Sequence, residues 1–181
     1  MPMLTTDNTV FLLVDVQGKL ANSMHEREHL FSNLKKLVKG MRVLEVPILW
    51  AEQNPKGLGP TVAEIAELLT DVQTIPKLSF SCYKNTDFRQ ALETLNRPNV
   101  VVAGIETHVC VYQTIRDLAR AAYRVQLVAD AVSSRTSENK QIGIEKCKGA
   151  GAAITSVETV LFELLDVAEG ESFKNILDII R

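Results

Sequence analysis

The sequence lacks several features that would point to particular classes of protein. Its three cysteines, Cys82, Cys110 and Cys147, do not have the short spacing of a metal site, so we expect free thiols and no disulfide framework. No apolar run is long enough to span a membrane, and residues 1–8 lack the basic start and apolar core of a secretory signal. We therefore expect a cytoplasmic protein with no membrane partner.

The sequence also has no large excess of positive or negative charge. The 20 Lys and Arg residues nearly balance the 22 Asp and Glu residues, which gives a net charge of -2 at pH 7. This balance offers no general attraction for phosphate backbones, so we expect no nucleic-acid partner. The 181 residues are 46% hydrophobic, which suffices for the core of one domain and is short for two. We predict a single domain over residues 1–181.

Apolar runs alternate with amphipathic segments along the whole chain. Expected strands cover residues 9–16, 48–51, 72–76, 99–103, 124–129 and 152–155. Expected helices cover residues 29–44, 61–69, 87–95, 109–122, 137–148, 157–165 and 173–180. Continuous apolar strands that alternate with helices predict an α/β protein with a three-layer α/β/α architecture and a doubly wound parallel sheet.

A candidate nucleophile follows the most apolar of these strands. After residues 99–103 and Gly104, apolar residues from Val109 onward recur at helical spacing, and Thr107 is a plausible N-cap. Cys110 would then be the third helical residue, where the helix dipole favours a thiolate and lowers the pKa. The alternative is that Cys110 is a small buried residue that only fills space under the helix.

Two further reactive groups follow strands of the same expected sheet. Asp15 comes at the end of the first strand and Lys77 directly after the third. In an open parallel sheet the ligand site lies beyond the carboxyl ends of the strands, where Cys110 is also expected. Taken singly, Asp15 could cap a turn and Lys77 could be an exposed loop cation. Together they predict one catalytic site.

Other side chains near the same strand ends are candidates for substrate binding. For the aromatic ones, packing in the core is the favoured interpretation, and Cys82 is expected to be an inert loop cysteine. The candidates are Gln17, Trp50, Glu52, Gln53, Phe80 and Tyr83.

The segment H-E-R-E-H at residues 25–29 matches the H-E-x-x-H signature of zinc proteases. Zinc would need both histidines on one helical face turned toward a cavity, and a third ligand. This segment is almost wholly polar, so we interpret it as solvated charge and expect no metal site.

Several motifs, in this order, resemble the isochorismatase-like cysteine hydrolase family. They are D-V-Q at residues 15–17, K-L-S-F-S at 77–81, G-I-E-T-H-V-C-V at 104–111 and D-A-V-S-S-R at 130–135. The string L-E-V-P-I-L-W-A-E-Q-N-P-K-G-L-G-P-T-V at residues 44–62 is similar to the isochorismatase-domain-containing proteins in particular. The resemblance extends over nearly the whole chain.

The resemblance implies a six-stranded parallel sheet and a catalytic triad of Asp15, Lys77 and Cys110. It also implies a cis peptide between Ile105 and Glu106, which would aim backbone N–H groups at a substrate oxygen as an oxyanion hole. The expected reaction is attack of the Cys110 thiolate on a carbonyl carbon, which cleaves an amide or carbamoyl C–N bond of a small molecule through a thioester. No cofactor is expected.

The sequence departs from two branches of the family. Nicotinamidases carry an aspartate and histidines after the second strand as metal ligands, whereas residues 51–54 are A-E-Q-N. The enzymes that hydrolyse isochorismate itself do not use the cysteine, so Cys110 argues against that reaction. The alternative to a hydrolase is a non-catalytic small-molecule-binding or scaffold protein that retains the fold.

The resemblance also implies a homo-oligomer, because members of this family commonly pair or form rings. The last expected helix has an apolar stripe that could supply a contact between subunits. The stripe consists of Phe173, Ile176, Leu177 and Ile180.

Overall fold

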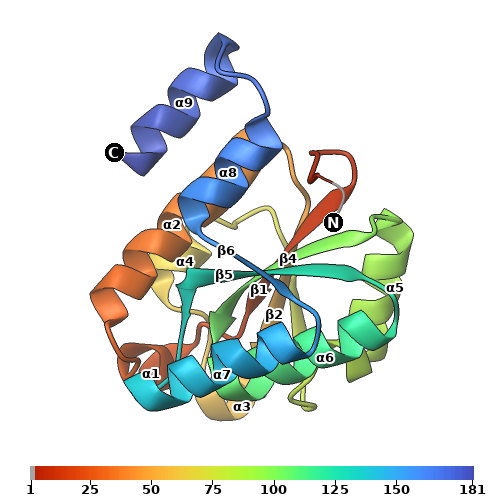
Figure 1. Cartoon of the computed structure of the whole chain (residues 1–181). Coiled ribbons are helices and arrows are strands. Elements are labelled where there is room, and N and C mark those ends of the chain that lie inside the picture. The colour runs from red at the N-terminus through yellow and green to blue at the C-terminus, as the bar shows by residue number, and fades with distance from the viewer. Residues whose placement is uncertain (1–2) are drawn as a thin grey trace.

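A computed structural model describes residues 3–181, so residues 1 and 2 of the expected domain lie outside the described part. A six-stranded sheet in the order β3-β2-β1-β4-β5-β6 forms the centre, and each pair of neighbouring strands is parallel (Figure 1). The strands are β1 (Thr9–Val14), β2 (Ile48–Gln53), β3 (Thr74–Lys77), β4 (Asn99–Ile105), β5 (Arg124–Ser133) and β6 (Ala153–Thr155).

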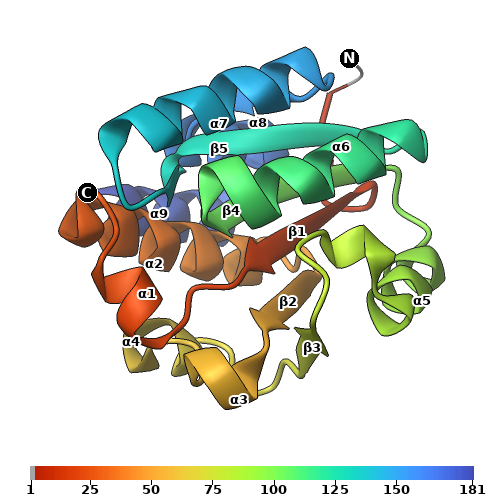
Figure 2. The ribbon, with the colours of Figure 1, turned by 90° about the horizontal axis from the view of Figure 1, so that it is seen from below.

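Helices cover both faces of this sheet, as Figure 2 shows. The core on one face is shared with α2 (Arg27–Val43), α4 (Ala63–Ala66) and α8 (Val157–Leu165), and α9 (Gly170–Ile180) packs on the outside of α2 and α8. The other face packs against α5 (Thr86–Leu95), α6 (Tyr112–Arg120) and α7 (Ser137–Gly149). The short helices α1 (Gly18–Asn22) and α3 (Pro55–Leu58), a 3₁₀ turn at Cys82–Lys84 and a π-helical turn at Thr107–Val111 lie in the connections. The predicted three-layer α/β/α fold with a doubly wound sheet is confirmed.

The central strand β1 shows why the chain forms this sheet. Phe11 and Leu13 belong to the core under α2 and α8, whereas Val10, Leu12 and Val14 belong to the core under α5, α6 and α7. Because side chains alternate between the faces of a strand, a strand covered on both faces must be apolar throughout. The continuous apolar run of β1 meets that requirement.

Side-chain caps fix where three helices begin. Asn85 accepts a hydrogen bond from the backbone N–H of Phe88 at the start of α5. Thr136 caps α7 and Ser156 caps α8 in the same way. Each cap satisfies an N–H group that the helix leaves without an internal partner, typically worth about 1 kcal/mol. The caps therefore hold α5 and α7 at defined positions beside the carboxyl edge.

Several expected element boundaries were wrong. β1 ends at Val14 and not at residue 16, because Asp15 turns out of the sheet with a φ of 52°. β5 continues to Ser133 and not only to residue 129, because after the irregularity between Val102 and Gly104 it pairs again with the end of β4. In both cases the boundary depends on where the backbone leaves the sheet or pairs with its neighbour, and the pattern of apolar residues does not reveal this.

The segment before α6 also differs from the expectation. Thr107 does not cap a helix: it is the first residue of the π-helical turn, and its buried hydroxyl has no hydrogen-bond partner. Cys110 is the fourth residue of that turn and not the third residue of an α-helix. No helix within residues 3–181 combines the length and apolar character needed to cross a membrane.

Candidate active site

Asp15, Lys77 and Cys110 meet at the carboxyl edge of the sheet. Asp15 directly follows β1, Lys77 is the last residue of β3, and Cys110 lies in the π-helical turn after β4. Strand β2 lies between β1 and β3, and its last residue Gln53 is in register with Lys77. The Lys77 side chain spans the end of β2 and places Nζ 2.7 Å from Asp15 Oδ2. The sequence-predicted groups are therefore brought together.

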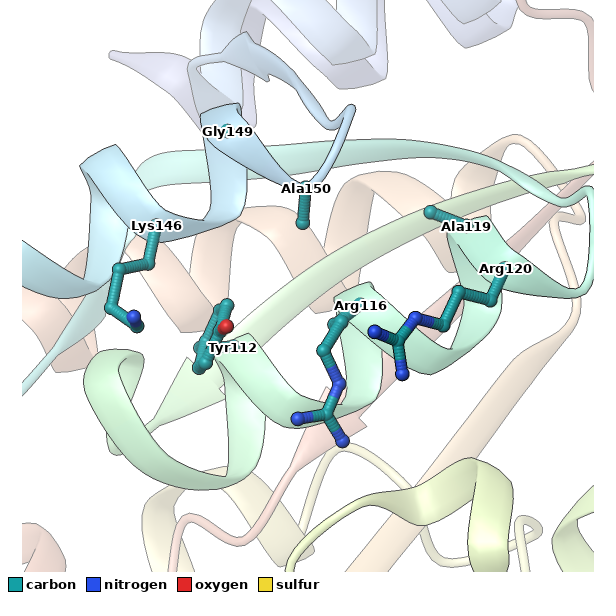
Figure 3. A pocket seen from close by; sticks show the side chains of 7 residues that line it. All are labelled: Tyr112, Arg116, Ala119, Arg120, Lys146, Gly149 and Ala150. Atoms are coloured by element: carbon teal, nitrogen blue, oxygen red, sulfur yellow. The ribbon is translucent and has the colours of Figure 1, made fainter.

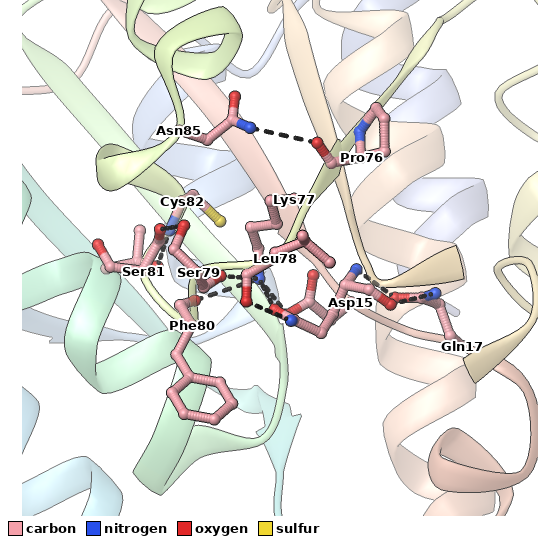
Figure 4. Close-up of polar contacts among 12 residues, drawn as sticks. Asp15, Gln17, Pro76, Lys77, Leu78, Ser79, Phe80, Ser81, Cys82 and Asn85 are labelled. Carbon is pink, nitrogen blue, oxygen red and sulfur yellow. Dashed lines mark hydrogen bonds and ion pairs between the residues drawn. The ribbon is translucent and has the colours of Figure 1, made fainter. Parts of the chain in front are cut away.

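The Lys77 ammonium is held by oxygen acceptors on several sides (Figure 4). Besides Asp15, Nζ donates to Gln53 Oε1 at 2.8 Å and to the backbone carbonyls of Phe80 at 3.1 Å and Ser79 at 3.3 Å. The Lys77 and Asp15 side chains are only 1% and 2% exposed. A buried charge needs such compensation, so the cation is fixed in one position.

A cavity of about 110 Å³ lies beside this ion pair. Asp15, Gln53, Phe80, Glu106 and Cys110 contribute polar groups or an aromatic ring to its lining. The rest of the lining is aliphatic and consists of Leu20, Leu58, Ile105 and Val109. A small, largely apolar cavity with a thiol and a carboxylate in its wall can enclose a small uncharged group next to a nucleophile.

Burial governs the ionisation of the two groups in the cavity wall. It raises the pKa of the Cys110 thiol above its ordinary value, the negative charge of Asp15 raises it further, and Lys77 opposes both effects. Burial also raises the pKa of Asp15, against the lowering effect of Lys77. The expectation that a helix N-terminus lowers the pKa of Cys110 was therefore wrong. In the resting site Cys110 is a thiol beside a carboxylate that attracts protons.

Lys77 stays a cation in this environment. Burial acts to lower the pKa of its ammonium, but electrostatic interactions in the site, including the ion pair and hydrogen bond with Asp15, outweigh burial and raise the pKa.

The second carboxylate oxygen of Asp15, Oδ1, is not bound by Lys77. It is buried and has no hydrogen-bond partner among residues 3–181. The Cys110 thiol lies close enough to the Asp15 carboxylate for each group to shift the other's pKa. Oδ1 is therefore available to accept the proton of Cys110.

Glu106 contributes both its side chain and its backbone to the site. The peptide bond between Ile105 and Glu106 is cis. The Glu106 carbonyl accepts hydrogen bonds from the N–H groups of Val109 and Val111, which shape the turn that carries Cys110. Its carboxylate accepts from the backbone N–H and the Nε of Arg135, at 3.2 and 3.1 Å. Glu106 therefore links the end of β4 to the end of β5.

The other candidates for substrate binding lie differently. Gln53 and Phe80 line the cavity, whereas the remaining four lie outside its lining. Gln17 is fully buried and bonds the backbone of Gln53 and Gly59. Trp50 donates to Thr61, Glu52 accepts two hydrogen bonds from Thr61, and Tyr83 contacts Tyr123 edge to face. These contacts position the segments around the cavity.

Three lining residues, Leu20, Leu58 and Val109, are not among the candidates named from the sequence. Leu20 and Leu58 come from α1 and α3, which approach each other closely: a Cβ at Gly18 would lie 2.4 Å from the carbonyl oxygen of Leu58. Gly18 also has a φ of +45°, so glycine suits both its conformation and this contact. Aliphatic residues in short polar segments carry no sequence signal for a cavity wall. Among residues 3–181 no group of three or more His, Cys, Asp or Glu side chains is placed to hold a metal.

The fold and the cavity define a class of protein: a doubly wound α/β protein with a buried thiol, carboxylate and ammonium at the carboxyl edge of its sheet. The profile of the isochorismatase domain matches residues 9–159. The chain is 33% identical over 174 residues to isochorismatase domain-containing protein 2 of Danio rerio. The aligned region covers 96% of this chain and 87% of that relative. The chain therefore belongs to the isochorismatase family.

Solved structures show the same fold. The MAR1 ribonuclease from Caenorhabditis elegans matches with a TM-score of 0.92 and 30% identity, over 99% of this chain and 92% of that one. The YcaC gene product from Escherichia coli, an octameric hydrolase of unknown specificity, matches with a TM-score of 0.93 and 21% identity, over 99% and 90% of the two chains. This chain thus has the isochorismatase-like hydrolase fold.

Proposed function

We propose that this protein is a cysteine hydrolase that cleaves an amide or carbamoyl C–N bond of a small molecule. The observation that carries the proposal is that Asp15 and Cys110 line one small cavity, with Lys77 bound to Asp15 beside it. A thiol beside a carboxylate base, with a cation holding that base, is the arrangement that nucleophilic catalysis requires. Membership of the isochorismatase family supports this assignment.

The reaction would begin when Asp15 accepts the proton of Cys110. The raised pKa of Asp15 makes it a stronger base than an ordinary carboxylate, and Lys77 holds it in place. The thiolate attacks the carbonyl carbon, and the backbone N–H groups of Glu106 and Cys110 hold the oxyanion, each such donor typically being worth about 3–4 kcal/mol. The C–N bond then breaks and protonated Asp15 gives its proton to the leaving amine.

The second half of the reaction would release the thioester. Asp15, again a carboxylate, accepts a proton from a water molecule that attacks the thioester carbon. The carbon–sulfur bond breaks, the proton returns to Cys110 and an acid leaves. Each step uses only the substrate, water and these side chains, so the scheme needs no cofactor.

The size of the cavity limits the substrate. Its volume of about 110 Å³ is below the ~300–1,000 Å³ that is usual for drug-sized ligands. We infer that a small acyl or carbamoyl group enters it, between aliphatic side chains. A nucleotide does not fit this space, and the net charge of -2 gives no attraction for RNA. The similarity to the Caenorhabditis elegans ribonuclease therefore does not lead us to propose RNA as a substrate of this chain.

The proposal is tested by assaying a panel of small amides and carbamoyl compounds with wild type, Cys110→Ala and Cys147→Ala. Cys147 is the matched control because it is also a free buried cysteine but lies in α7, outside the cavity lining. We expect Cys110→Ala to lose at least about 10⁴-fold in turnover, as the loss of a nucleophile typically does, and Cys147→Ala to remain active. Mass spectrometry of rapidly quenched wild type should show an acyl adduct on Cys110.

Equal turnover by wild type and Cys110→Ala would refute the mechanism. Binding of panel members without turnover or an acyl adduct would favour the alternative, a non-catalytic small-molecule-binding protein.

Assembly into a homo-oligomer and a cytoplasmic location stay predictions. The apolar stripe on α9 is used partly within the chain, because Ile176 is fully buried and Ile180 packs against the core. Phe173 and Leu177 are half-buried and could still contact another subunit. Light scattering coupled to size-exclusion chromatography would measure the assembly directly.

A further inference from the structure

A hollow of about 560 Å³ lies on the surface between α6 and α7 (Figure 3). Tyr112, Arg116, Ala119 and Arg120 line it from α6, and Lys146, Gly149 and Ala150 line it from the end of α7. It shares no lining residue with the active-site cavity. The proposed hydrolase mechanism gives this hollow no role.

Positive charge gathers in the hollow without a carboxylate in its lining. Arg116 and Arg120 are four residues apart on one face of α6, and Figure 3 shows their guanidinium groups projecting to the same side. Like charges at this spacing on a helix repel each other. Lys146 brings a further cation from α7, with Nζ 4.7 Å from the centre of the Tyr112 ring. Negative charge placed in the hollow would therefore be attracted by all three cations.

The described residues supply only part of that charge. Arg116 pairs with its neighbour Asp117 at 2.8 Å. The Arg120 guanidinium makes no hydrogen bond or ion pair with any of residues 3–181, and the Lys146 ammonium interacts only with the ring of Tyr112 among these residues. Two cationic groups in the hollow are therefore left without an anionic partner.

The helix dipole does not explain why three cationic side chains lie around the hollow. Cations in the last turn of a helix are favoured by its dipole, and α7 carries both Lys146 and Lys148 there. Lys148 satisfies that preference outside the lining of the hollow. The dipole favours both lysines equally, so it does not explain why Lys146 joins two arginines from another helix.

We propose that this hollow binds the phosphate group of a small phosphorylated molecule. Guanidinium groups present paired donors that match phosphate oxygens, and an ammonium adds a point charge. The volume of about 560 Å³ lies within the usual range for small-molecule sites. Apart from Tyr112, the uncharged lining residues are alanine and glycine, so the hollow offers little apolar surface for insertion into a membrane.

The test is isothermal titration calorimetry with sodium pyrophosphate at constant ionic strength, on wild type, Arg120→Ala, Lys146→Ala and Lys148→Ala. We expect wild type to bind one pyrophosphate per chain. Arg120→Ala and Lys146→Ala should bind it about tenfold or more weakly, as expected when one charge-assisted hydrogen bond is lost. Lys148→Ala is the matched control, with the same charge change in the same helical turn, and should bind like wild type. Circular dichroism checks that each variant is folded.

Several outcomes would overturn the proposal. One is the absence of pyrophosphate binding by wild type at millimolar concentration. Another is equal weakening by Lys148→Ala and Lys146→Ala, which would indicate a diffuse field and no built site. A third is Arg120-dependent cosedimentation with phosphatidic acid vesicles in the absence of pyrophosphate binding, which would assign the charge to a lipid surface.

Discussion

The candidate active-site cavity and the hollow between α6 and α7 have charged groups in different surroundings. Beside the cavity, the Asp15–Lys77 pair is nearly fully buried, with side chains 2% and 1% exposed. Beside the hollow, the Arg116–Asp117 pair is more open, at 29% and 11%. The distances between the paired atoms are similar, 2.7 and 2.8 Å. The two pairs therefore differ in their surroundings and not in their geometry.

This difference decides what each region can do. Because the buried charges have no contact with water, the hydrogen bonds that remain hold the ammonium of Lys77 in one position. The same burial raises the pKa of Asp15. The half-buried Arg116–Asp117 pair is screened by water and contributes less to stability, and the exposed cations beside it, Arg120 and Lys146, are free to bind an external ion. The cavity is therefore suited to chemistry and the hollow to reversible binding.

Breaking the buried pair should have the largest effect. Lys77→Met leaves the Asp15 carboxylate buried without its cation, and we expect a loss of about 3–5 kcal/mol in the free energy of unfolding at neutral pH. Urea denaturation measures it. Lys84→Met is the control because Lys84 is an exposed lysine in the nearby 3₁₀ turn, and it should unfold like wild type.

The loss in Lys77→Met should depend on pH. Burial already raises the pKa of Asp15 above 3.8, and loss of the cation raises it further. The folded variant then binds a proton more tightly than the unfolded chain, so acid favours its folded form. The deficit relative to wild type should shrink as the pH falls through the raised pKa. A deficit that is constant with pH would show that Asp15 carries no buried charge.

A second substitution tests how the turn around Cys110 is held. A Cβ at Gly143 in α7 would lie 2.6 Å from the backbone nitrogen of His108, whereas one at Gly149 in the same helix would meet nothing within 4 Å. Gly143→Ala should lose about 1–3 kcal/mol by overpacking and should lower kcat by shifting the turn. Gly149→Ala should lose neither. Equal behaviour of the two variants would show that α7 does not position Cys110.

The ionisation of Cys110 can be followed by iodoacetamide labelling against pH, resolved by peptide mass spectrometry. Because burial and Asp15 raise its pKa, wild-type Cys110 should label more slowly than a free thiol near neutral pH. Asp15→Asn removes a neighbouring negative charge, so it should lower the pKa and speed labelling. Lys77→Met should slow it. Fast labelling of wild type near pH 7 would restore the hypothesis of a resting thiolate.

The smallest effect is expected at the half-buried pair. Asp117→Asn removes the negative partner of Arg116, and we expect a change of only about 1 kcal/mol in the free energy of unfolding, because a partly exposed pair is screened by water more than the Asp15–Lys77 pair is. Urea denaturation beside Lys77→Met makes the comparison direct. A loss as large as that of Lys77→Met would remove the distinction between the two regions.

The sequence predicted the central features because they depend on local periodicity. Apolar runs marked the central strands, and the rule that sites lie beyond the carboxyl ends of parallel strands brought Asp15, Lys77 and Cys110 to one edge. The cavity-lining residues that come from the short helices α1 and α3 could not be predicted in this way. Leu20 and Leu58 reach the cavity through the close contact of α1 and α3 at Gly18, which involves segments far apart in the chain.

The order of reactive groups along the chain, their placement at or just beyond strand ends and the family motifs were thus determined by the sequence itself. The tertiary structure alone decided the protonation of Cys110 and the direction of Asp15. It also decided which candidates face the cavity and how Arg116, Arg120 and Lys146 converge between two helices. Burial and charge proximity set these properties, and both depend on residues brought together from distant parts of the chain.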